Sequence, residues 1–265
     1  MVKSTAMDFV LFTALFAVAM FGGMLLFSEV GRRAGIAQLA RNAGALTQGA
    51  GAAEAAVFAL LGLLLAFTFS GAASRFEDRR HLIAQEANAI GTAYLRLDLL
   101  AADAQPELRQ LFRDYVDNRA SVYSDTRDLD EVRAKLAAGA ALQQQIWTRS
   151  LRATQQPGAA SQAGILLLPA LNDMIDITTT RAAATQNHPP IIVFLLLAVL
   201  GLIGAMLVGY STSVNKRRGW LHTLVFATIL SLTAYVIVDL EYPRLGLIRV
   251  DSADQLLHDL RASMR

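Results

Sequence analysis

The side chains that most often carry enzyme chemistry are sparse in this chain and lie far apart. The sequence contains no cysteine, and its histidines share no H-E-x-x-H or comparable carboxylate spacing. Zinc sites and catalytic thiols depend on such residues at short, regular intervals. We therefore expect no metal site and no reactive thiol. The histidines concerned are His81, His188, His222 and His258.

Two carboxylate pairs are close enough in sequence to act together, Asp173 with Asp176 and Glu77 with Asp78. General acid–base catalysis also needs a partner group at the reacting atoms, and neither pair has a base or metal ligand nearby in sequence. We interpret both pairs as solvated helix charge. The motifs G-x-x-x-x-G-K-[ST], G-x-G-x-x-G after a strand and G-x-S-x-G are also missing, so the sequence predicts no enzyme and no cofactor.

The elements that dominate the chain are long apolar segments. Four runs, 9–27, 55–73, 191–210 and 220–238, lack Asp, Glu, Lys and Arg. Each has roughly the 20 helical residues that cross about 30 Å of hydrocarbon. The sequence therefore predicts an all-α integral membrane protein with four transmembrane helices and the lipid bilayer as its surroundings.

The first run has a signal peptide as its alternative interpretation, because Lys3 precedes it. Arg32 and Arg33 follow it like a stop-transfer flank, and no clear small-x-small cleavage site comes before them. We expect the run to be kept as a span. Asp8 and Asp239 lie at span ends, where we expect water to reach them.

Span positions divide the chain into four parts. Residues 1–73 hold the first two spans, 74–190 form an extramembrane helical insert, 191–238 hold the last two spans, and 239–265 form a tail. This 2+2 arrangement puts both termini and the insert on the same side of the membrane.

Within the insert, apolar residues recur with helical spacing over 106–123, 129–147 and 165–185, and no strand alternation is evident. In the tail, Ser252 and Gln255 predict a capping box for a short helix.

One stretch crosses from the second span into the insert without a helix breaker: "LLGLLLAFTFSGAASRFEDRRHLIAQEANAIGTAYLRL", residues 60–97. A heptad line through it predicts one continuous helix with one continuously buried edge. Outside the bilayer, its opposite face is polar and is most simply a solvated surface. The line's stalk-packing members are Phe76, Ile83, Ile90 and Leu97.

Small residues recur every four positions in two of the spans, at Gly62 and Ala66 and at Gly201, Ala205 and Gly209. Such spacing lets helix backbones approach closely in lipid. The pattern predicts tight packing, either within one chain or between copies.

The stretch quoted above, with "LRQLFRDYV" and the terminal "DLEYPRLGLIRVD", resembles the bestrophin-like family of bacterial membrane proteins. The most specific part is R-F-E-D-R-R … Q-E-A-N-A-I, residues 75–90. More distantly, the resemblance implies the bestrophin architecture, an oligomeric anion channel whose second membrane helix lines a hydrophobic neck. The tryptophan-rich segment and the acidic calcium clasp of the eukaryotic proteins are missing, so calcium gating is not implied.

From these observations we expect a homo-oligomer that passes ions, anions in particular, along an axis built from the second span. Phe67, Phe69 and Ser70 would form the constriction, and Arg75, Arg79 and Arg80 would attract ions to its mouth. The competing hypothesis is a non-conducting envelope scaffold or sensor that binds a partner or ligand through the insert. Its contact groups would be Tyr115, Tyr123 and Trp147.

The expected location is the bacterial inner membrane. Lys and Arg in the short loops, at 32, 33, 41 and 216–218, outnumber those on the other side, Lys3 and the tail arginines 244, 249, 261 and 265, which favours termini and insert outside. Counting Arg75, Arg79 and Arg80, directly after the second span, removes this difference, and the family resemblance implies an insert in the cytosol. The net charge of +2, with no basic tract, predicts no nucleic-acid partner.

Overall fold

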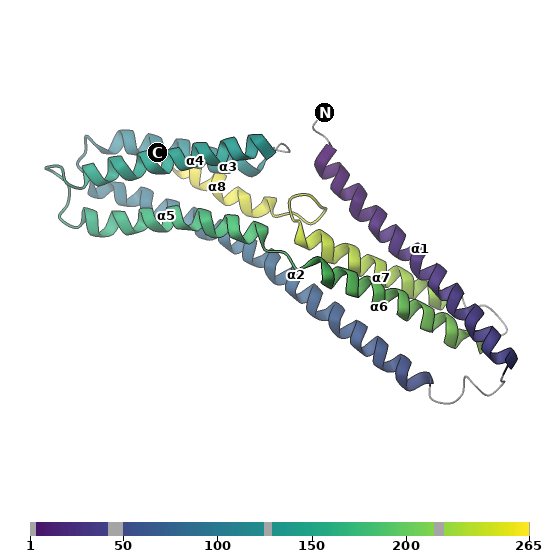
Figure 1. Cartoon of the computed structure of the whole chain (residues 1–265). Helices are drawn as coiled ribbons and strands as arrows, with labels where there is room; N and C mark the ends of the chain where they lie inside the picture. The colour runs from purple at the N-terminus through teal and green to yellow at the C-terminus, as the bar shows by residue number, and fades with distance from the viewer. Residues whose placement is uncertain (1–3, 42–49, 125–128, 215–219, 265) are drawn as a thin grey trace. The chain divides into compact units, whose positions relative to one another are not determined.

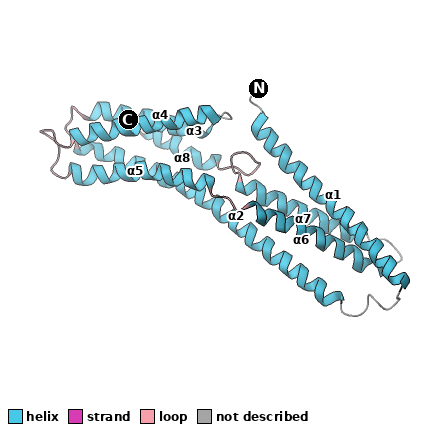
Figure 2. Ribbon diagram, in the orientation of Figure 1, coloured by secondary structure: helices cyan, strands magenta, loops and turns pink. Residues whose placement is uncertain are grey.

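The computed structural model describes residues 4–41, 50–124, 129–214 and 220–264, and in these ranges it contains helices and turns but no strand (Figure 2). The predicted all-α class is confirmed. The α-helices are α1 (Ser4–Arg41), α2 (Ala50–Leu95), α3 (Gln105–Ser124), α4 (Leu129–Ala153), α5 (Ala163–Gln186), α6 (Ile191–Ser211), α7 (Trp220–Glu241) and α8 (Asp251–Ser263). Two short 3₁₀ helices, η1 (Arg96–Leu99) and η2 (Thr212–Val214), follow α2 and α6.

Four helical stretches are long and apolar enough to cross a membrane: Phe9–Arg41, Glu54–Leu99, Ala163–Val214 and Trp220–Glu241. They contain the four runs picked out by composition. Lys3 and the basic residues 216–218, which entered the loop count, lie outside the described residues.

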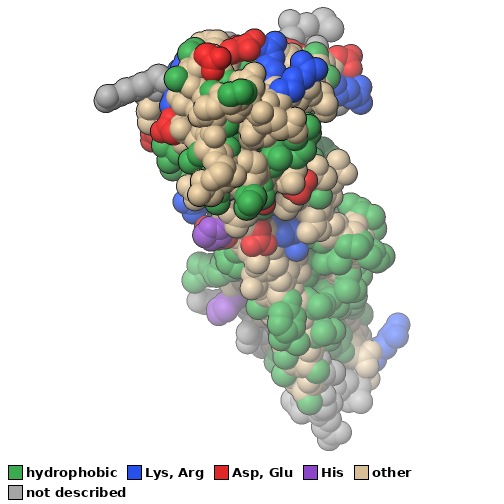
Figure 3. All heavy atoms as spheres, turned by 90° about the vertical axis from the view of Figure 1, so that its left-hand side faces the viewer, with side chains coloured by type: hydrophobic (Ala, Val, Ile, Leu, Met, Phe, Trp, Pro, Cys, Tyr) green, Lys and Arg blue, Asp and Glu red, His purple; other side chains and the backbone are tan. Residues whose placement is uncertain are grey.

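The chain divides into two compact units. The apolar unit comprises Met7–Ser74 and His188–Leu247, that is, most of α1, the first half of α2, α6 and α7. The polar unit comprises Met1–Ala6, Arg75–Asn187 and Ile248–Arg265, with the second half of α2 and with α3, α4, α5 and α8 (Figure 1). Charged side chains of both signs gather on the polar unit in Figure 3, whereas hydrophobic side chains dominate the visible surface of the apolar unit.

The core of the polar unit is made by one face from each of its helices. Phe112 and Tyr115 of α3, Leu171 and Met174 of α5, and Leu257 of α8 are all buried in one cluster. The three insert helices occupy the segments predicted from apolar spacing, with Pro106 in the first turn of α3.

The predicted capping box at the start of α8 is wrong. The helix begins at Asp251, its N-cap is Val250, and no side chain caps it. Ser252 already lies inside the first turn, while the Gln255 amide donates to Asp259 at 3.0 Å. The start of α8 is set instead by apolar packing, because Val250 and Ala253 are buried with Ile83 of α2.

In the apolar unit, α1 and α6 cross at backbone contact. A Cβ atom added at Gly209 would lie 1.8 Å from the Ser28 carbonyl oxygen, and one added at Gly31 would lie 1.9 Å from that of Met206. Only glycine fits at such a distance. The crossing therefore depends on two glycines from different helices.

The expectation that water reaches Asp239 at the end of α7 is wrong. Its side chain is buried, and its Oδ1 accepts a hydrogen bond from the Leu247 amide at 3.0 Å. Gly246 allows this turn, since a Cβ there would lie 1.9 Å from Asp239 Oδ1. Glu241, two residues further on, is also buried and lies 3.4 Å from His188 Nδ1. The side chain of Asp8 is outside the described residues.

Candidate functional site: the exposed strip of helix α2

Helix α2 is a single α-helix of 46 residues that belongs to both units. At 1.5 Å per residue it is about 69 Å long. The predicted continuity between Ser70 and Arg80 is confirmed, because the helix has no break there. The sequence favours this, since no proline interrupts the segment.

One face of α2 is exposed along most of its length. Its exposed residues recur every three or four positions, which is the spacing of one helix face. From first to last they cover about ten turns, or about 54 Å. We call this face the α2 strip, and it consists of Ala59, Leu63, Ala66, Phe67, Ser70, Ser74, Asp78, His81, Gln85, Asn88, Thr92 and Leu95.

The candidate constriction residues are on or beside this strip. Ser70 and Phe67, which is 67% exposed, lie within it. Phe69, 42% exposed, lies on its flank. No part of the described apolar unit covers these side chains fully. In one isolated copy of the chain they face the surroundings.

The three arginines after the apolar run have different environments. Arg80 is exposed and forms a 2.9 Å ion pair with Glu77. Arg79 is buried, and it donates to the carbonyl oxygens of Ala184 and Asn187 at 3.2 and 3.1 Å. Those carbonyls end α5, so Arg79 caps that helix. Arg75 is half-buried.

The predicted stalk-packing edge is buried in the polar unit alone. Ile83, Ile90 and Leu97 are fully buried there, and Phe76 packs beside Ile83. In the apolar unit the same heptad line carries Phe69, which is exposed. A single chain therefore buries this edge only within the polar unit, and one continuously buried edge stays a prediction for an assembly of several copies. The cover over Ile83 comes from Val250 and Ala253 of the same chain.

The small residues of α6 are buried, whereas those of α2 are exposed. Gly201, Ala205 and Gly209 are buried within the apolar unit. Gly62 and Ala66 are exposed, and no atom lies within 4 Å of a Cβ placed at Gly62. The α6 residues thus serve packing inside the chain, while those of α2 remain available to another molecule.

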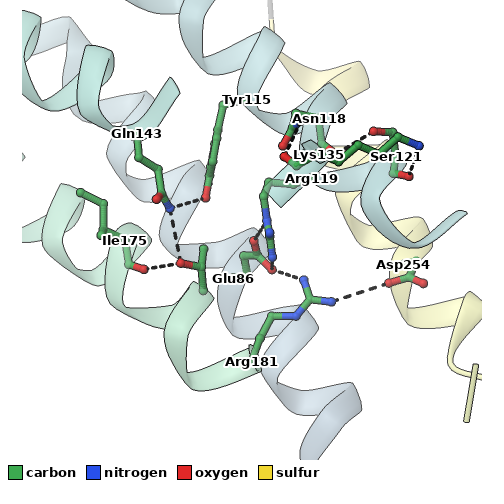
Figure 4. Close-up of polar contacts among 11 residues, drawn as sticks. Glu86, Tyr115, Asn118, Arg119, Ser121, Lys135, Gln143, Ile175, Arg181 and Asp254 are labelled. Atoms are coloured by element: carbon green, nitrogen blue, oxygen red, sulfur yellow. Dashed lines mark hydrogen bonds and ion pairs between the residues drawn. The ribbon is translucent and has the colours of Figure 1, made fainter. Parts of the chain in front are cut away.

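The polar unit also contains a buried ionic cluster that sequence reasoning missed. Glu86 of α2 is fully buried and binds the guanidinium groups of Arg119 on α3 and Arg181 on α5 (Figure 4). Arg181 in turn lies 4.0 Å from Asp254 of α8. Burial alone would raise the pKa of Glu86, but the charges of Arg181 and Arg119 outweigh it and lower this pKa.

A signal for this cluster was present in the sequence. Glu86 lies three residues after Ile83 and four before Ile90, so it falls on the apolar face of the helix. A carboxylate at such a position needs a buried cation as its partner. The sequence could not show which arginines fold against it.

Two of the contact groups proposed for a partner-binding insert are part of the core instead. Tyr115 is fully buried, and its hydroxyl accepts a hydrogen bond from the Gln143 amide at 2.9 Å. Trp147 packs against the same core cluster. Burial raises the pKa of Tyr115. The side chain of Tyr123 is outside the described residues.

Among the described residues, no group of three metal-ligating side chains occurs. What the arrangement offers is a long helix whose buried face is fixed by ion pairs and apolar packing, and whose other face is open. A chain built in this way can place that open face against copies of itself.

Comparisons with known proteins agree with this architecture. A family model described as a Bestrophin-like domain matches residues 40–255. A search of curated proteins found no match.

Among solved structures, the chain is similar to a bacterial bestrophin homologue from Klebsiella pneumoniae. A form with a tryptophan-to-alanine mutation is 13% identical with a TM-score of 0.67, and the match covers 93% of this chain and 98% of that one. The form solved by Zn-SAD phasing is also 13% identical, with a TM-score of 0.63 over 91% and 97%. The family match spans most of the sequence and the fold is shared nearly end to end, so this chain belongs to the bestrophin-like family.

Proposed function

We propose that the protein is a homo-oligomeric membrane protein that forms a passive path for ions, of the anion-channel type. In this proposal α1, α2, α6 and α7 span the bacterial inner membrane in a 2+2 arrangement. The polar unit then lies outside the bilayer, between the second and third spans. The bilayer, ions and further copies of the chain are its partners.

The observation that carries the proposal is the α2 strip. In the apolar unit it is small or hydrophobic, with Ala66, Phe67 and Ser70, and beyond Ser74 it becomes polar. Contact with lipid accounts for the exposure of the part of the strip that lies in the apolar unit. It does not account for an exposed face that continues in line along the helix for about ten turns. Copies arranged around an axis would turn this face toward a shared path.

In such an assembly Phe67, Phe69 and Ser70 would form the narrow part. Rings of aromatic side chains can close a path by dewetting, without any moving plug. The exposed Gly62 and Ala66, which precede Phe67 along α2, would let neighbouring α2 helices approach each other closely.

At the polar end of this narrow part, Arg75 and Arg80 would raise the local concentration of anions. Arg80 is accessible but shares its charge with Glu77. Arg79 contributes to the mouth only indirectly, because its hydrogen bonds hold the end of α5 in place. The expected preference for anions is therefore modest.

Ion flux from liposomes tests the proposal. Purified protein should release a trapped salt gradient, and Phe67→Ala and Phe69→Ala should change the rate. Phe12→Ala is the matched control, because Phe12 is an equally exposed aromatic of α1, at 65%. Absence of flux, or equal effects of all three variants, would contradict the channel and favour the scaffold.

A further inference from the structure

The first side chains of the α2 strip beyond Ser74 that can bind a metal are Asp78 and His81. They are three residues apart on one helix, which puts their Cβ atoms about 5–6 Å from each other on adjacent turns. A carboxylate oxygen and an imidazole nitrogen can then reach the same ion. Both side chains are exposed.

Neither side chain is engaged by the rest of the described chain. No hydrogen bond or ion pair involves Asp78 or His81 among the residues that the structure covers. Their charged neighbours are placed differently, with Glu77 paired to Arg80 and Arg79 bonded to the end of α5. The adjacent charged side chains are thus engaged within the chain, whereas Asp78 and His81 remain available to bind an ion.

A single chain cannot complete the site. Transition-metal sites of the zinc type hold four ligands, commonly His nitrogen and Asp oxygen at about 2.0–2.2 Å. The described residues contain no group of three such side chains. Two copies that meet along the α2 strip would supply two carboxylates and two imidazoles.

We propose that Asp78 and His81 are half of a divalent transition-metal site, which a second copy of the chain completes. This inference rests on the proposed function, because it needs α2 strips that face one another. The imidazole selects zinc-like ions, since Mg²⁺ and Ca²⁺ prefer oxygen ligands. A bound ion so close to the constriction obstructs the path and adds positive charge to it.

Two measurements on the full-length protein test the site, both with zinc chloride as the probe. The first is zinc inhibition of flux from liposomes. The second is zinc binding in detergent, followed by competition with a chromophoric chelator. His81→Gln and Asp78→Asn should each weaken zinc affinity and inhibition by about 10-fold or more. His258→Gln, which changes an exposed histidine of α8, is the control and should leave both unaltered.

The outcomes separate this site from the channel. Zinc binding that depends on both residues, with fewer bound ions than chains, supports the site even where no flux is seen. Absence of flux then counts against the channel alone. Flux that zinc does not inhibit, together with binding that His81→Gln leaves unchanged, overturns the site and leaves the channel standing. Tight binding by separated single chains also overturns it, because one chain supplies too few ligands.

Discussion

Arg119 and Glu86 form an ion pair inside the polar unit, with Arg119 Nε 2.5 Å from Glu86 Oε1 and both side chains nearly inaccessible to solvent. Arg181 binds the other oxygen of the same carboxylate. One acidic group of α2 therefore holds a cation from each of two other helices. These contacts fix the register of α2 against α3 and α5.

Replacing Glu86 with glutamine should destabilise the polar unit strongly. The variant removes the buried carboxylate charge that faces two buried guanidinium groups, a loss of about 3–5 kcal/mol in the free energy of unfolding. Urea unfolding of the full chain in detergent, followed by circular dichroism, measures this. Glu77→Gln is the control, because its exposed pair with Arg80 is worth less than about 1 kcal/mol. Equal losses from the two variants would contradict the proposed role of burial.

Acid should weaken the same cluster. Glu86 lies beyond the apolar run of α2, and the charges of Arg181 and Arg119 outweigh burial and hold its pKa in the folded chain below the ordinary value of 4.5. A carboxylate with a depressed folded pKa stabilises the protein above its unfolded pKa, and this contribution is lost as pH falls through the folded value. The stability difference between wild type and Glu86→Gln should therefore be full at neutral pH and should shrink below about pH 4.5. A difference that stays constant down to strong acid would count against this linkage.

The crossing of α1 and α6 predicts a severe effect at Gly209. A Cβ atom there would lie 1.8 Å from the Ser28 carbonyl oxygen, so Gly209→Ala must force the two helices apart. We expect a loss of about 3 kcal/mol or more, at or beyond the upper end for overpacking. Thermal unfolding in detergent measures it. Gly22→Ala of α1 is the matched control, because nothing lies within 4 Å of its added Cβ. A Gly209→Ala protein as stable as the control would show that this contact is not tight.

Gly246→Ala should disturb the turn that buries Asp239. The added methyl group would lie 1.9 Å from Asp239 Oδ1, the oxygen that accepts the Leu247 amide. The carboxylate must move and lose this bond, at a cost of about 1–3 kcal/mol. Unfolding curves of Gly246→Ala and of Gly51→Ala, whose added Cβ contacts nothing within 4 Å, give the comparison. Indistinguishable curves would mean that the turn accommodates the added methyl group without loss of stability.

Arg79 and Arg80 are adjacent but should respond differently to substitution. Arg79→Gln removes donors from the carbonyls of Ala184 and Asn187, so it should lower stability by about 1.5–3 kcal/mol per charged hydrogen bond lost. Arg80→Gln should leave stability within about 1 kcal/mol and shift the reversal potential of liposome currents toward cations. Unfolding and reversal-potential measurements on both variants check this. A shift in selectivity from Arg79→Gln alone would reverse the assignment.

The sequence by itself determined the all-α class, the four apolar helices, the helical segments of the insert and the continuity of α2. These features follow from composition and from local spacing. An uncharged run of about 20 residues, or an apolar period near 3.6, needs no distant contact to be recognised.

Tertiary structure decided which faces and charges are buried. Ile83 is covered by Val250 and Ala253, and Glu86 by Arg119 and Arg181, all distant in sequence. Asp239 is buried because a turn containing Gly246 folds over it, and the start of α8 is set by packing in place of the expected cap. A helical period shows that a face has a partner, but the partner is chosen by long-range packing and by the cost of leaving a charge without a counter-ion. Only the folded chain can therefore show that one face of α2 stays open along its length.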